Sequence, residues 1–180
     1  MKESLKLVVV GIALCSSLKS AAAQKTYALG LGGGAAIPVG TLGDTQKTGF
    51  NGIAVLALGG ADLPIGIRID AIYNSFPSQA QSGATAQGFR IAGALGNLVY
   101  AFPGTNAKTY LIAGGGVYST KFDVAGTKAE NHGGLNAGAG ATFRFGPIAS
   151  FLESRYHFIS RKPDKGGVIH FVPITFGLLF

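Results

Sequence analysis

The stretch 168–180, VIHFVPITFGLLF, is the most regular part of the sequence and repeats with a period of two residues. Alternate positions counted back from the last residue form one apolar face, made of Val172, Ile174, Phe176, Leu178 and Phe180. The positions between them form a smaller, mixed face, made of Pro173, Thr175, Gly177 and Leu179. Successive side chains of a β-strand point to opposite faces, so this pattern predicts a strand. Pro173 alone counts against it, because proline cannot donate to a strand ladder.

The composition favours a sheet that lies in a membrane over a soluble domain. Hydrophobic residues make up 47% of the 180 residues and charged residues only 13%, which is few charges for a soluble domain. Beyond the N-terminus, no apolar run reaches the roughly 18–20 residues that a membrane helix needs. The 29 glycines follow no three-residue period, which excludes collagen. An apolar, glycine-rich chain of this kind is typical of a transmembrane β-barrel.

The N-terminus has the three parts of a secretory signal peptide. Residues 1–6 are basic, 7–15 form a short apolar core, and 21–23 are alanines of the kind found at a cleavage site. The apolar core is too short to span a membrane as a helix. We therefore expect a cleaved signal peptide, 1–23, followed by one outer-membrane β-barrel domain, 24–180.

Eight segments in all have the length and pattern of strands. Their ranges are 27–37, 50–60, 65–74, 89–102, 108–122, 135–145, 148–159 and 168–180. The phase of 50–60 is open, and so is that of 108–122, which three successive glycines interrupt. The segment 89–102 loses its alternation near Gly96, where a β-bulge would explain the change.

The connections between these segments alternate in length. Three are short, at 61–64, 103–107 and 146–147, and four are longer, at 38–49, 75–88, 123–134 and 160–167. Short periplasmic turns and longer external loops are the rule in outer-membrane barrels. In lipid only a closed sheet leaves no backbone group unpaired. The sequence therefore predicts an all-β, eight-stranded antiparallel up-and-down transmembrane β-barrel with both ends of the chain on the periplasmic side.

If the apolar faces point outward, the polar faces point into the barrel. We expect an interior polar network of Arg68, Asp70, Arg90, Arg144, Glu153, Arg155 and His157. Arginine suits such a network because its planar guanidinium makes several hydrogen bonds at once. Eight strands enclose only enough space for side chains, so we interpret the network as a structural plug. An ion or proton path is the alternative.

Aromatic residues near the strand ends predict two girdles at the membrane interfaces. One is expected to hold Tyr27, Phe102, Tyr110, Phe145 and Phe180, and the other Phe50, Phe76, Phe89, Phe122 and Phe158.

Three features together resemble a known family: the signal peptide, the segment 153–158 (ESRYHF) and the ending 171–180 (FVPITFGLLF). They are similar to the OmpA/OmpX-like group of bacterial outer-membrane β-barrel domains. The resemblance implies an outer-membrane location and recognition of the last strand by the barrel-assembly machinery, with Phe176, Leu178 and Phe180 as the assembly signal. It implies no cofactor, and no cell-wall tether is expected after Phe180. The family is functionally diverse, so the fold does not settle the function.

Catalytic and metal-binding readings find little support in the sequence. His157 and Ser160 faintly resemble the His-x-Ser of the lipid A deacylase barrel, but three residues apart on a strand they point to opposite faces. His132 and His170 lack metal-ligand spacing. The cations are dispersed in an exported chain, so no nucleic-acid partner is expected. We expect no enzyme, with a lipid A-modifying esterase as one alternative and a secreted lipocalin-like ligand carrier as another.

The connection 160–167 carries the only hint of a partner. Within it, Arg161, Lys162 and Lys165 set three cations against Asp164. Arginine and lysine both bind phosphate groups, and this connection is expected on the external side. We therefore expect these three residues to contact lipopolysaccharide, with a merely solvated turn as the alternative. The oligomeric state stays open.

Overall fold

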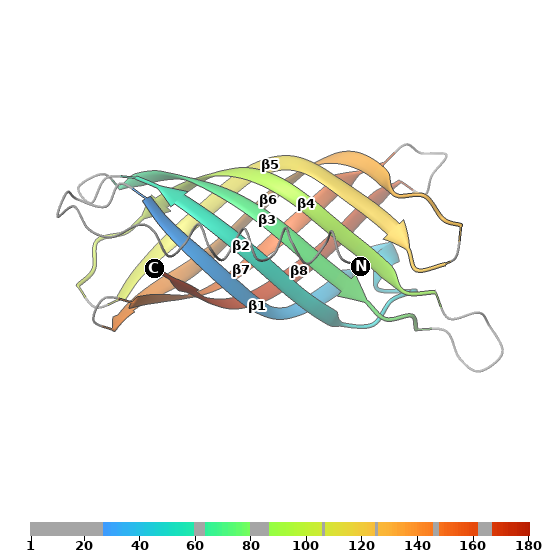
Figure 1. Cartoon of the computed structure of the whole chain (residues 1–180), viewed down its shortest axis with the longest axis horizontal. Coiled ribbons are helices and arrows are strands. Elements are labelled where there is room, and N and C mark those ends of the chain that lie inside the picture. Colours follow the sequence, from blue (N-terminus) through green and yellow to red (C-terminus); the bar gives the residue numbers. More distant parts are fainter. Residues whose placement is uncertain are drawn as a thin grey trace, which may run out of the picture.

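The computed structural model describes residues 27–59, 64–79, 87–105, 107–124, 126–145, 148–161 and 167–180. Together these residues form one sheet that is rolled into a closed barrel (Figure 1). The predicted signal peptide lies outside the described residues. No helix in the described part of the chain is long and apolar enough to cross a membrane.

Eight antiparallel strands follow one another around the barrel in sequence order. They are β1 (Tyr27–Val39), β2 (Gly49–Leu58), β3 (Ile65–Phe76), β4 (Phe89–Ala101), β5 (Ala107–Phe122), β6 (Glu130–Phe145), β7 (Ile148–Ser160) and β8 (Val168–Leu179). The first strand pairs with the last, with Gly34 opposite Thr175, and this pairing removes the two free edges of the sheet. The predicted all-β, up-and-down fold is confirmed.

The two ends of the barrel differ. The short-turn end, at left in Figure 1, holds the starts of β1, β3, β5 and β7 and the ends of β2, β4, β6 and β8. The long-loop end, at right, holds the ends of β1, β3, β5 and β7 and the starts of β2, β4, β6 and β8.

Two expected irregularities are absent from strands that the structure describes throughout. The glycines 114–116 do not interrupt β5, because they pair with β4 on one side and β6 on the other. The bulge suspected in β4 is wrong, because Gly96 and Asn97 pair in continuous register with Ile69 and Arg68. The inward alternation is kept there, and only the polarity of the inward side chains changes.

The structure also fixes the open phases. In β2, Asn51, Ile53 and Val55 point into the barrel and are buried. In β5, Tyr110 and Tyr118 point inward, and Val117 points outward with 57% of its surface exposed. Both strands therefore put apolar side chains on their inner as well as their outer face, which is why periodicity alone did not decide their phase.

The outer wall is apolar, as expected for the membrane-facing side of a barrel. On β3, Ile65, Ile67 and Ile69 point outward and are about half exposed. On β8, Ile174 and Phe176 do the same. About half of each of these side chains is left uncovered by the protein, so its burial requires a surrounding apolar phase.

The interior is mixed rather than uniformly polar. Toward the long-loop end it holds an apolar layer of Phe76, Phe89, Ile91, Tyr118, Ile159, Ile169 and Phe171, all nearly fully buried. Phe76 packs edge-on against Phe171, with ring centroids 5.8 Å apart. The predicted girdle position is therefore wrong for Phe76 and Phe89, and also for Tyr110, which is buried nearer the short-turn end. An eight-stranded barrel has to be filled, and aromatic rings fill it as well as polar groups do.

Inward glycines make room for these large side chains. Phe151 of β7 lies across Gly32 of β1 and Gly177 of β8. A Cβ added at Gly177 would collide with its ring, and one added at Gly32 would make a tight contact with it. The rings of Tyr110 and Tyr118 cover inward glycines of β6 in the same way. The glycine content of the chain thus follows in part from the narrow lumen.

The connection after β1 folds over the long-loop mouth. A short 3₁₀ helix, η1 (Gly40–Leu42), places Leu42 against the apolar layer, where it is buried. The next residues pair with the β3–β4 connection, since Gln46 bridges Ser78 and the Gln46 Nε2 donates to the Gln87 carbonyl at 3.3 Å. The β1–β2 connection therefore packs against part of this mouth.

Candidate functional site

A cluster of four charged side chains lies inside the barrel and joins two opposite strands. Arg68 and Asp70 stand two residues apart on β3, and Glu153 and Arg155 stand two residues apart on β7. Residues at this spacing share one face of a strand, and in both strands that face is the inner one. All four side chains are at least 93% buried.

The four charges form a closed cycle across the lumen. The Arg68 guanidinium holds both carboxylate oxygens of Glu153, with Nη1–Oε2 and Nη2–Oε1 distances of 2.8 Å, and its Nε donates to Asp70 at 2.9 Å. Arg155 completes the cycle, since its Nε lies 2.6 Å from Glu153 Oε1 and its Nη1 lies 2.9 Å from Asp70 Oδ2. Two cations therefore balance two anions, which is how buried charges are tolerated.

Neutral side chains complete the network. The Tyr110 hydroxyl donates to Glu153 at 2.8 Å, and the Asn97 amide donates to Asp70 at 2.9 Å. Asn136 accepts a hydrogen bond of 3.3 Å from Arg155. None of these three residues was among those predicted for the interior network, and their inward phase on β5, β4 and β6 is the signal that could have identified them.

His157 lies apart from the ion cycle, in the apolar layer. Its Nδ1 shares a hydrogen bond of 2.9 Å with the Tyr118 hydroxyl, and its ring stacks on Phe171 at a centroid distance of 4.5 Å. Ser160 points to the opposite, outer side of β7, since the residue before it is fully buried and Ser160 itself is exposed. The histidine and the serine therefore do not form a nucleophile–base pair.

The interior position predicted for Arg90 and Arg144 is wrong. Arg90 lies between the buried Phe89 and Ile91, so it points outward, where it pairs with Asp123. Arg144 has the inward phase but is exposed, because it lies at the end of β6 at the short-turn mouth, where its long side chain reaches solvent. The remaining five predicted residues lie inside the barrel.

The other predicted sites are placed only in part. Arg161 is half-buried at the end of β7, where its Nε donates to the Gly167 carbonyl at 3.4 Å, whereas Lys162 and Lys165 lie outside the described residues. Phe176 and Leu178 point outward from β8, and Phe180 follows them at the short-turn end, each about half exposed. The backbone of Phe180 is held by Leu29 through two hydrogen bonds of 2.8 and 3.0 Å.

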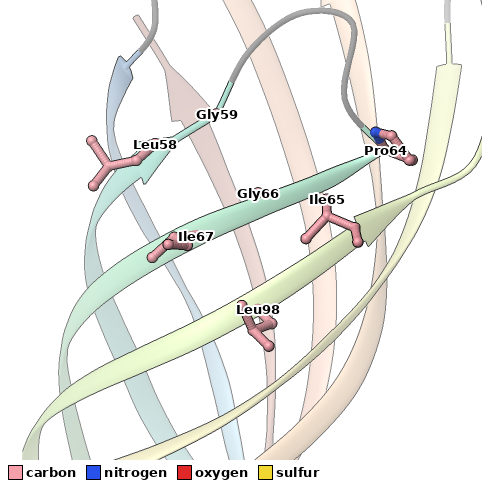
Figure 2. Close-up of a pocket in the computed structure, with 7 residues that line it drawn as sticks. All are labelled: Leu58, Gly59, Pro64, Ile65, Gly66, Ile67 and Leu98. Carbon is pink, nitrogen blue, oxygen red and sulfur yellow. The ribbon is translucent and has the colours of Figure 1, made fainter.

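A shallow groove marks the outer wall at the short-turn end of β2, β3 and β4 (Figure 2). It is lined by Leu58, Gly59, Pro64, Ile65, Gly66, Ile67 and Leu98. None of these seven residues has a polar side chain, so the groove offers no chemistry beyond apolar contact. Nowhere in the described ranges do three His, Cys, Asp or Glu side chains gather in a way that could hold a metal ion.

The sequence matches no protein-family model and no curated protein. Two solved structures of similar shape are those of Neisserial surface protein A (NspA) and of a major outer membrane protein from Thermus thermophilus. The NspA likeness covers 86% of this chain and 96% of that chain, with a TM-score of 0.67 and 17% identity. The Thermus thermophilus likeness covers 86% and 97%, with a TM-score of 0.51 and 12% identity. The chain therefore has the fold of eight-stranded outer-membrane barrels.

Proposed function

We propose that this chain is a non-enzymatic integral protein of the bacterial outer membrane, whose filled barrel anchors external loops that contact lipopolysaccharide or an external partner. The observation that carries the proposal is the contrast between the two faces of the wall. The inner face is closed by the ion cycle and the aromatic layer, and the outer face presents about half-exposed apolar side chains such as Ile67 and Phe176.

The filled interior supports an anchoring role over a transport role. The cycle of Arg68, Asp70, Glu153 and Arg155 spans the lumen from β3 to β7, and the apolar layer lies between it and the long-loop mouth. An ion that followed the axis would have to break the cycle and cross the apolar layer. The interpretation of the interior charges as a structural plug therefore agrees better with these contacts than an ion path does.

The outer wall supports membrane insertion over the lipocalin-like alternative. A soluble carrier needs a polar outer face and a cavity for its ligand, whereas here β3 exposes three isoleucines and the lumen is occupied by the protein's own side chains. The outward row of Phe176, Leu178 and Phe180 is also available to the barrel-assembly machinery at the short-turn end. The esterase alternative loses its only candidate pair, since His157 and Ser160 point to opposite faces.

The contact with lipopolysaccharide rests on the cations at the long-loop end. Arg161 begins the β7–β8 connection, whose sequence 161–165 has three cations and one anion. The phosphates of lipopolysaccharide would lie at this level if the long loops face the exterior. An external protein is the other partner that such loops could serve.

Membrane fractionation and electrophoresis test the proposal. We expect the protein to remain with outer membranes after an alkaline wash, and to migrate differently in SDS gels before and after boiling, because all ladder bonds are internal. We also expect no reproducible conductance steps in planar bilayers. Recovery in the soluble fraction would overturn the membrane location, and stable open-channel currents would overturn the plug.

A further inference from the structure

Two cations lie side by side on the outer wall of the barrel, next to its apolar side chains. Arg90 of β4 and Lys121 of β5 are directly opposite each other in the strand register. Both point outward, since Phe89, Ile91 and Thr120 beside them point inward and are buried. Both are exposed. The pair does not follow from the sequence, which predicts an interior position for Arg90.

The pairing carries an electrostatic cost that the described structure only partly relieves. Residues directly opposite on antiparallel strands lie about 4.5–5.5 Å apart at their Cα atoms, and like charges in such positions are destabilising. Asp123 pairs with Arg90, but that salt bridge is about half exposed. Asp123 therefore neutralises Arg90 only in part, and an additional anion that contacts both Arg90 and Lys121 would relieve the remaining repulsion.

The surroundings of the pair point to a phosphate at a membrane interface. Ser75 of β3 lies opposite Arg90 on its other side, and Ser119 is the outward residue that precedes Lys121 on β5, so hydroxyl groups flank the cations. Four residues further along the strands, Ala94 and Val117 form an apolar outward pair. Phosphate-binding groups thus lie next to apolar side chains on the outer wall, on the side of the long-loop end.

We infer that Arg90 and Lys121 form a binding site for a lipid A phosphate on the outer wall of the barrel. The Arg90 guanidinium can bind phosphate oxygens as a fork while Asp123 holds its Nη2, and the Lys121 ammonium neutralises the remaining charge. The acyl chains of the same lipid would extend along Ala94 and Val117. This inference rests on the proposed outer-membrane location and names a site other than the 161–165 connection.

Thermal unfolding of the refolded protein tests the site. The protein in neutral detergent is mixed with phosphorylated lipid A, with dephosphorylated lipid A or with inorganic phosphate, and the loss of the fast-migrating folded band is followed. For the wild type, phosphorylated lipid A is expected to raise the midpoint by about 2–4 °C over dephosphorylated lipid A. The double variant Arg90→Gln/Lys121→Gln should lose this difference. The matched control Lys47→Gln/Lys128→Gln, which removes two exposed loop cations at the same end, should keep it.

The single variant Lys121→Gln is expected to change the unfolding temperature and the stabilisation by the lipid in opposite directions. Lys121→Gln removes the repulsion but leaves the pair of Arg90 with Asp123, so in neutral detergent it should unfold at a higher temperature than the wild type. Phosphorylated lipid A should raise the unfolding midpoint of this variant by less than it raises that of the wild type. A lower midpoint in neutral detergent would overturn the argument from repulsion.

The outcomes separate this inference from the proposed function. Equal stabilisation of wild type and double variant by phosphorylated lipid A would overturn the site, and a full effect of inorganic phosphate would overturn its assignment to a lipid. In both cases a protein that still sediments with outer membranes and keeps its heat-dependent gel mobility leaves the proposed function intact. If the wild-type protein lacked these two properties, both the proposed function and the lipid A site would be overturned.

Discussion

Glutamine in place of Glu153 is the most direct test of the interior ion cycle. The Glu153 carboxylate receives two contacts of 2.8 Å from Arg68, one of 2.6 Å from Arg155 and one of 2.8 Å from Tyr110. Glutamine keeps the shape of the side chain, but it removes the charge and turns an NH₂ group toward guanidinium donors. Two buried arginines are then left with Asp70 alone. Removal of one partner from a buried ion pair costs about 3–5 kcal/mol, and we expect Glu153→Gln to lower the free energy of unfolding by that amount.

The assay is urea unfolding of the refolded barrel in detergent, followed by circular dichroism and by the folded band in unboiled gels. The control is Glu130→Gln at the start of β6, whose carboxylate is 42% exposed and lies 3.7 Å from His132. Because the Glu130 carboxylate is partly exposed and screened by solvent, its interactions are expected to contribute about 0–1 kcal/mol, so the control should unfold close to the wild type. Similar urea midpoints for the two variants would refute the account of the ion cycle.

A double variant distinguishes charge balance from simple loss of contacts. Glu153→Gln/Arg155→Gln removes one anion and one cation, which leaves Arg68 with Asp70 as a balanced pair. If the imbalance is the main cost, the double variant should be more stable than Glu153→Gln alone. Additive losses from the two single variants would show that the residues act independently.

Two further predictions concern packing and assembly. Gly177→Ala should cost about 1–3 kcal/mol, because its Cβ would collide with the Phe151 ring, whereas Gly96→Ala, with open space around the Cβ, should leave the urea midpoint unchanged. Phe180→Ser should reduce the folded barrel recovered from cell membranes while refolding in detergent proceeds as for the wild type, because the backbone bonds of Phe180 to Leu29 need no side chain. An equal loss in both settings would mean that Phe180 serves stability rather than assembly.

Strand number, order and orientation could be predicted from the sequence because two independent signals agreed. The two-residue period of β3 and β8 set their outward faces, and the alternation of short and long connections set the up-and-down order. Backbone pairing in a closed barrel depends on these features alone, so the prediction did not need the side-chain contacts.

The placement of the interior residues was harder, because polarity is a poor guide to the inside of a narrow barrel. Arg68 and Asp70 were placed correctly because an apolar row alternates with them, whereas Arg90 alternates with Phe89 and Ile91, which are as apolar as an outward row.

The lumen needs volume as well as charge balance, and the aromatic side chains supply it on the same strands that carry cations. When both faces of a strand could turn inward, side chains on the opposite strands decide between them. The sequence of a single strand does not reveal these partners. Among the described residues, Asp70 and Glu153 supply the carboxylates of the ion cycle, and both already bind Arg68 and Arg155. An inward Arg90 would therefore lack a carboxylate partner. Its outward position thus follows from the same charge balance that holds the other arginines inside.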